Sequence, residues 1–244
     1  MADDRLRLLE RRFRETGSAE AEAAWLRERV RQGELAAWRL DVARHCGHPG
    51  LARPGQDPLA FGPWLAGLPF PRRRGRVVRD WVRVPLAGFA ALAPVVEAMG
   101  TGAVAREAQA AIEACVVHGG CAPPVLDGLD FGLRDFRYER HPDAWEPCPP
   151  DVAATWFLSA ATRFLRLGEV AGDLEDWARK ALEPEGVWGV ERGVQQAIER
   201  ALPCESGRLW ALRQAIAAEL VPWALDDHDP LRARTEARRD GDAS

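Results

Sequence analysis

Cysteine and histidine residues are clustered at two points of the sequence, and both residue types are common zinc ligands. The first cluster reads His45-Cys46-Gly47-His48, and the second spans residues 115–121. Cys115 and His118 are three positions apart, so in a helix they share a face, and Cys121 could return to it over the two glycines between them. Three ligands from the second cluster and one from the first would complete a tetrahedral zinc site.

A purely structural interpretation of these clusters competes with zinc binding. Cys46 and Cys115 fall on apolar helical stripes, where cysteine packs as a small hydrophobic residue. His45 and His118 are close to predicted helix C-termini, where the helix dipole favours a cation. No Cys-x-x-Cys pair occurs, and the odd number of cysteines, five, favours free thiols over a disulfide framework. We therefore expect no cofactor and keep zinc as the alternative.

The same clusters also offer a catalytic Cys–His pair. Such a pair needs a thiol of low pKa beside an imidazole in a cleft, and no recognised nucleophile motif surrounds any of the cysteines. The sequence also lacks a P-loop, a dinucleotide fingerprint, a Gly-x-Ser-x-Gly elbow and a His-Glu-x-x-His helix. We therefore expect that the chain is not an enzyme, and keep a metal- or thiol-dependent enzyme that uses both clusters as the alternative.

Arginine is concentrated between residues 72 and 83, a stretch that also contains a tryptophan. Guanidinium and indole groups are frequent anchors of protein interfaces, and arginine also pairs with acidic surfaces and phosphates. We predict a partner-binding surface that combines this stretch with tryptophans of two irregular segments. Its residues are Trp64, Arg72, Arg73, Arg74, Arg76, Arg79, Trp81, Arg83 and Trp145.

The composition restricts the class of partner and the cell compartment. The chain has 244 residues, 47% of them hydrophobic, and a net charge of −4, which argues against a dedicated nucleic-acid binder. Arginine supplies every basic residue except Lys180 and asparagine is absent, which indicates a GC-rich bacterial genome rather than phosphate binding. The N-terminus carries no secretory signal, and the uncharged run after Arg83 is shorter than the roughly 20 residues that span a bilayer. We expect a cytoplasmic protein without membrane contact.

Helical periodicity with glycine stops organises residues 1–47 into a predicted three-helix unit. Ser18 is a suitable N-cap, and Gly17, Gly33 and Gly47 each follow an apolar helical stripe as C′-type residues. Residues 48–84 form a connection rich in proline and arginine, whose apolar residues indicate that it packs on the core. Residues 85–229 form a helical domain with an irregular insertion at 119–150, and residues 230–244 a charged, disordered tail.

Further helices are predicted at about 86–99, 102–118, 151–167, 172–183, 187–202 and 206–225, and no alternating β pattern is found. The fold class is therefore all-α, with about eight or nine helices and no significant sheet. Short glycine turns between helices favour an irregular helical bundle or a HEAT- or TPR-like stack, although no clean repeat of fixed length occurs.

Both ends of the chain resemble one protein family. The segments Leu9-Glu-Arg-Arg-Phe, Ala24-Trp-Leu-Arg-Glu and His45-Cys-Gly-His, with Leu212-Arg-Gln-Ala-Ile near the C-terminus, carry the resemblance. They are similar to a multicopy family of uncharacterised helical proteins from GC-rich bacteria of the myxobacterial type. The resemblance covers roughly the first 50 and last 25 residues. It implies a helical fold and a bacterial source, and no activity.

Together these patterns indicate a non-catalytic module that binds another protein. Helical packing, surfaces rich in tryptophan and arginine, and the absence of catalytic motifs all favour this function. A more specific version is an immunity-type or regulatory protein that binds one cognate partner.

Overall fold

The computed structural model describes residues 2–51, 64, 67–69, 80–98, 102–120, 122–140, 150–169 and 206–242. These residues form nine helices and no strand, which confirms the predicted all-α class. Within the described part of the chain, no helix combines the length and the apolar character needed to cross a membrane. The helices predicted at 172–183 and 187–202 lie outside the described residues.

The chain divides into two compact units. The first contains Met1–Pro71 and Ala217–Pro230, and the second contains Arg72–Ile216 and Leu231–Ser244. The sequence had suggested a boundary at residue 47 and a single helical domain from 85 to 229. The structure instead returns a segment from near the C-terminus to the N-terminal helices, a pairing of distant segments that local periodicity does not reveal.

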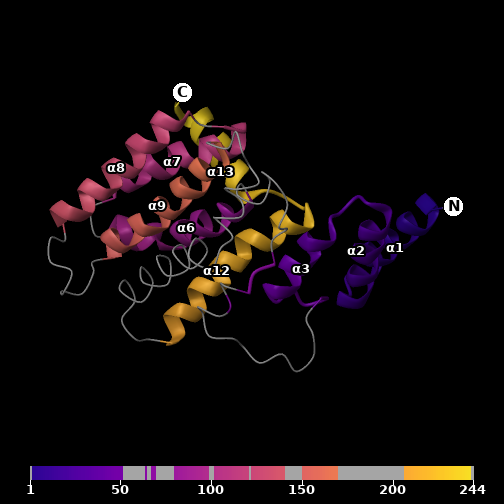
Figure 1. The fold of residues 1–244 in the computed structure, drawn as a ribbon. Coiled ribbons are helices and arrows are strands. Elements are labelled where there is room, and N and C mark those ends of the chain that lie inside the picture. Colours follow the sequence, from indigo (N-terminus) through magenta and orange to yellow (C-terminus); the bar gives the residue numbers. More distant parts are fainter. Residues whose placement is uncertain are drawn as a thin grey trace. The chain divides into compact units, whose positions relative to one another are not determined.

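Three helices open the first unit: α1 (Ala2–Thr16), α2 (Ala19–Gln32) and α3 (Ala37–His45) (Figure 1). The Oγ of Ser18 accepts a hydrogen bond from the amide of Ala21, so the predicted N-cap of α2 is confirmed. Gly33 ends this helix with φ +79°, in the left-handed region that glycine enters without strain.

From Ala217 onward, α12 (Ser206–Leu225) belongs to the first unit, and the helix ends in a Schellman turn. The amide of Asp227 donates to the carbonyl of Pro222 over 3.0 Å, and the amide of Asp226 donates to that of Trp223 over 3.2 Å. Asp226 has φ +66°, a conformation that glycine usually supplies at this position. Unlike glycine, Asp226 has a carboxylate, and this carboxylate pairs with two arginines of the first unit.

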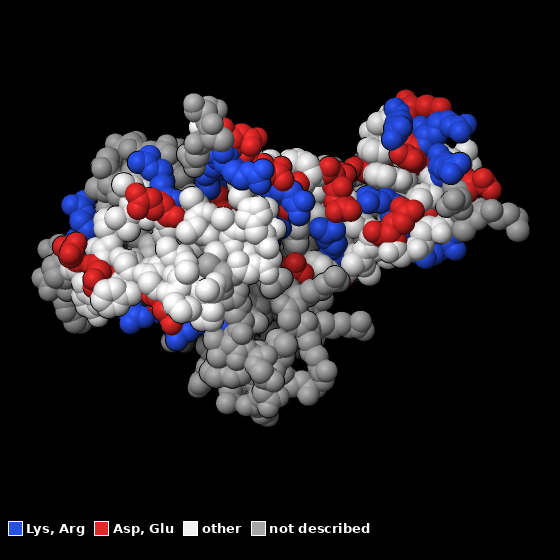
Figure 2. All heavy atoms as spheres, turned by 90° about the horizontal axis from the view of Figure 1, so that it is seen from above, with Lys and Arg blue, Asp and Glu red and all other residues white. Residues whose placement is uncertain are grey.

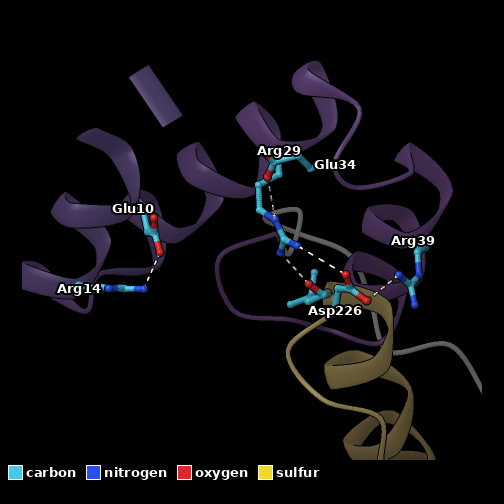
Figure 3. A network of polar contacts seen from close by, with 7 residues as sticks. Glu10, Arg14, Arg29, Glu34, Arg39 and Asp226 are labelled. Carbon is cyan, nitrogen blue, oxygen red and sulfur yellow. Dashed lines mark hydrogen bonds and ion pairs between the residues drawn. The ribbon is translucent and has the colours of Figure 1, made fainter. Parts of the chain in front are cut away.

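Two arginines from α2 and α3 bind this helix end (Figure 3). Arg29 donates to the carbonyl of Leu225 over 2.8 Å, and Arg39 donates to the carbonyl of Trp223 over 2.7 Å. The carboxylate of Asp226 lies 3.2 Å from Arg39 and 3.9 Å from Arg29. We call Arg29, Arg39 and Asp226 the arginine clamp. It places positive charge at the negative end of the helix dipole.

Aromatic rings enclose the arginine clamp. The guanidinium of Arg39 lies 5.0 Å from the ring centroid of Trp223, and that of Arg29 lies 5.0 Å from the ring of Trp25. Trp38 packs against Trp223 with ring centroids 5.9 Å apart. The arginine side chains are only 13% and 19% exposed, so these cation–π contacts are partly shielded from water.

The second unit is arranged around α9 (Pro150–Glu169), which packs against α6 (Arg83–Ala98), α7 (Ala103–His118) and α8 (Pro123–Arg140) (Figure 1). Both apolar and hydroxyl side chains of α9 are buried, among them Phe157, Leu158 and Ser159. Gly88 of α6 lets the two backbones approach, because a Cβ there would lie 2.6 Å from the ring of Phe157.

The last residues of the chain are helical rather than disordered, so the prediction for 230–244 is corrected. They form α13 (Pro230–Asp242), in which Leu231 and Thr235 are buried. Arg234 and Arg238, one turn apart, both form ion pairs with Glu113 of α7, whose side chain is fully buried. A buried carboxylate needs such partners, and they explain why this charged segment is ordered.

The segment 119–150 is also more regular than predicted, because it contains the 18-residue helix α8. Prolines led to the error. Pro123, Pro150 and Pro230 each stand at the first residue of a helix, where the missing N–H costs no hydrogen bond. Proline therefore begins α8 and α13, which the sequence analysis had not predicted, and also α9, which it had.

We predict that Arg39→Met lowers the free energy of unfolding of the first unit by about 2–3 kcal/mol, because a charge-assisted hydrogen bond, an ion pair and a cation–π contact are lost together. Urea denaturation followed by tryptophan fluorescence measures this loss. Arg14→Met is the matched control, because Arg14 forms only an exposed pair with Glu10 (Figure 3), and it should cost no more than about 0.5 kcal/mol. Equal losses in the free energy of unfolding for Arg39→Met and Arg14→Met would contradict the prediction, because the arginine clamp would then add no more stability than an exposed ion pair.

We also predict a pH dependence that originates at Glu28 of α2. The guanidinium of Arg31 donates to this carboxylate and is the main reason why the pKa of Glu28 falls from 4.5 to about 2; Gln32 adds a hydrogen bond, and burial opposes the shift. The stabilisation is therefore complete above the unfolded pKa of 4.5 and is lost as the pH falls towards 2.

Glu28→Gln removes this contribution at every pH. The difference in urea midpoint between the native protein and Glu28→Gln should therefore be large near neutral pH and should shrink on acidification through the range between 4.5 and 2. A difference that stays constant across this range would show that the pKa of Glu28 is not lowered in the folded protein, and would contradict the prediction.

Candidate functional site

The first histidine of the His45-Cys46-Gly47-His48 cluster has a structural role in the first unit. The Nε2 of His45 lies 2.7 Å from the backbone carbonyl of Trp64, and the Nε1 of Trp64 donates to the carbonyl of His45 over 3.2 Å. The two rings also stack, with centroids 5.9 Å apart. Because a carbonyl oxygen only accepts, Nε2 carries a hydrogen here and is not available to ligate a metal.

The second histidine of this cluster pairs with α2. The Nε2 of His48 lies 3.3 Å from Oε1 of Glu22, and its Nδ1 is buried without a hydrogen-bond partner. Gly50 brings this loop against the start of α2, since a Cβ there would lie 2.6 Å from the carbonyl oxygen of Ala19. Cys46 is buried and forms no disulfide. Among the described residues, no group of three or more His, Cys, Asp or Glu side chains could hold a metal ion.

The second Cys/His cluster differs from the sequence prediction at its first residue. Cys115, in the last turn of α7, is disulfide-bonded, so the expectation of free thiols is wrong at this position. His118 is the last residue of α7 and is exposed, whereas Cys115 is buried. Cys121 lies outside the described residues. A sulfur in a disulfide offers neither a thiolate ligand nor a nucleophile.

The predicted partner-binding surface requires a correction at Trp64. This residue is fully buried and hydrogen-bonded to His45, so it cannot act as a surface anchor. Trp81 is half-buried and stacks on Phe164, with ring centroids 6.2 Å apart, and Arg83 is the half-buried first residue of α6. The remaining residues of the set lie outside the described part of the chain: Arg72, Arg73, Arg74, Arg76, Arg79 and Trp145.

The inner face of α8 fixes the rotation of this helix about its axis. Its buried residues are spaced by four, three and four positions: Leu126, Asp130, Leu133 and Arg137. Arg137 donates to the Oγ of Ser159 on α9 over 2.7 Å, and Arg166 of α9 lies 3.1 Å from the carboxylate of Asp127. These contacts attach α8 to α9 at both of its ends.

The opposite side of α8 carries large exposed aromatic side chains. Phe131 is 64% exposed and Tyr138 is 70% exposed, and their spacing of seven residues places them on one side of the helix. We call this side the α8 outer face, and its residues are Gly128, Phe131, Gly132, Asp135, Tyr138 and Glu139. Trp210 of α12 is also exposed, at 60%.

Sequence reasoning missed the α8 outer face because it took 119–150 as irregular. The spacing was nevertheless present in the sequence: Leu126 and Leu133 repeat every seven residues on one side, and Phe131 and Tyr138 repeat at the same interval on the other. A helix with apolar residues on two sides carries more apolar surface than one buried interface requires.

Comparison of the chain with protein-family models, with curated proteins and with solved structures finds no match to any of them.

Proposed function

We propose that the chain is a non-catalytic module that binds another protein through the α8 outer face. The observation that supports this most strongly is the exposure of Phe131 and Tyr138 on one side of a helix whose other side is fully packed. Aromatic residues are enriched in the energetic centres of protein interfaces, because they bury a large area at a small cost in side-chain entropy.

The α8 outer face also suits binding because its rings stand on a packed helix. Leu126 and Leu133 of α8 are buried and Arg137 donates to Ser159 of α9, so the exposed rings project from a helix rather than from a loop. Preorganised side chains lose less entropy on association. An immunity-type or regulatory protein with one cognate partner is the specific form of this proposal.

The alternative, an enzyme that uses the two Cys/His clusters, receives no such support. The disulfide of Cys115 removes the thiol that the second cluster needed, and His45 is engaged with Trp64. The proposal therefore treats both clusters as structural.

The test places a photo-cross-linking amino acid at position 131 of the full chain, expressed in its source cells. The proposal predicts one dominant covalent adduct with a single protein. The matched control is the same probe at Leu8 of α1, an exposed apolar residue outside the proposed surface, which should give no such adduct. The same adducts at both positions, or none at position 131, would overturn the proposal.

A second arm uses the partner once it has been isolated. Phe131→Ala and Tyr138→Ala should each weaken its binding about 10- to 30-fold, as expected for interface anchors. Both side chains are mostly exposed, so the free energy of unfolding should change by no more than about 0.5 kcal/mol. Unchanged affinity in both variants would place the interface elsewhere.

A further inference from the structure

The charges around the exposed aromatic residues of α8 are unbalanced. Asp135 and Glu139 are exposed, one helical turn apart, and lie on the same side of the helix as Phe131 and Tyr138. Neither carboxylate has an ion pair or hydrogen bond among the described residues. The α8 outer face therefore presents two acidic groups beside two aromatic rings.

The other charged residues of α8 near this surface already have partners. Arg134 forms an ion pair with Asp130 at 2.9 Å, and Asp127 pairs with Arg166 at 3.1 Å. Arg137 is buried against α9, and Arg140, at the end of the helix, has a contact of its own. The charge left for a ligand is therefore negative.

Two glycines beside the rings add no side chain to the surface of α8. Gly128 and Gly132 are four residues apart inside α8, and among the described residues no atom beyond the helix's own adjacent backbone lies within 4 Å of the point where a Cβ would stand on either of them. Glycine inside a helix costs about 1 kcal/mol relative to alanine, and no described neighbour here requires its small size. The missing side chains allow the backbone of an incoming segment to approach closely.

From these observations we propose that the α8 outer face binds a basic amphipathic helix of the partner protein. This inference rests on the proposed function and names the chemistry of the occupant. The apolar side of the incoming helix would cover Phe131 and Tyr138, which are about 10 Å apart along the axis, or two turns. Its lysines or arginines would pair with Asp135 and Glu139. Docking of a helix fits this surface, since the described residues contain no strand edge to extend.

The face of the second unit shown on the left of Figure 2 has a related pattern. A broad area of uncharged side chains is bordered there by charged ones. A centre depleted of charge with charged residues at its border is typical of protein interfaces, in which the rim charges select the partner.

The test titrates the full chain with a labelled synthetic helix of leucine, alanine and lysine, about 18 residues long, and follows fluorescence anisotropy. The control peptide has glutamate in place of every lysine. The lysine peptide should bind, with an affinity that falls as salt is raised, and the glutamate peptide should bind at least about tenfold more weakly. Equal binding of the two peptides, or no binding of the lysine peptide, would overturn the inference.

Matched variants locate the binding site. Asp135→Asn/Glu139→Gln should weaken binding of the lysine peptide about tenfold, because both of its pairing groups are removed. Glu107→Gln/Glu236→Gln makes the same change in net charge at exposed positions of α7 and α13 and should leave the affinity unchanged. Equal losses in the two double variants would show general attraction to an acidic protein and would overturn the proposed site.

The outcomes separate this inference from the proposed function. A specific adduct at position 131 combined with no preference for the lysine peptide would leave protein binding intact and reject the basic helix. Self-association of the free chain that Phe131→Ala abolishes would identify a second copy as the occupant and would likewise reject it.

Discussion

The carboxyl end of α12 is the constraint on which the first unit depends. A helix leaves its last carbonyls without internal partners, and in this chain two of them accept hydrogen bonds from Arg29 and Arg39. Asp226 takes the position that glycine usually occupies and adds a carboxylate between the two guanidiniums. These hydrogen bonds join residues nearly 200 positions apart. We therefore expect the packing of α2 and α3 to depend on the end of α12.

The second unit depends on the same physical requirement, that a buried polar group must be paired. Glu113 is held by two arginines of α13, and Arg137 is held by hydroxyl and carbonyl groups of α9. The contact of Arg137 fixes the rotation of α8 and thereby leaves Phe131 and Tyr138 on the outside. The exposure of the candidate interface thus follows from the hydrogen bonds that the inner face of α8 makes with α9.

Local signals in the sequence predicted most of the described helices, but not α8 and α13. The N-cap Ser18, the C-cap Gly33 and the bounds of α12 follow directly from capping and periodicity. The candidate site was missed, because Pro123 was interpreted as a break although it begins α8. The position of Trp64 was predicted wrongly, because this residue lies in the core. Its burial depends on contacts with another segment, among them the hydrogen bond to His45, which periodicity does not contain.

Hydrogen exchange of backbone amides tests most directly whether the arginine clamp closes the first unit. In Arg39→Met, the account predicts that amides of α3 and of the last two turns of α12 lose protection, while amides of α8 and α9 keep theirs. Unchanged protection in α3 and α12 would contradict the central role of the clamp. An equal loss in α9 would contradict the division of the chain into two separately stabilised units.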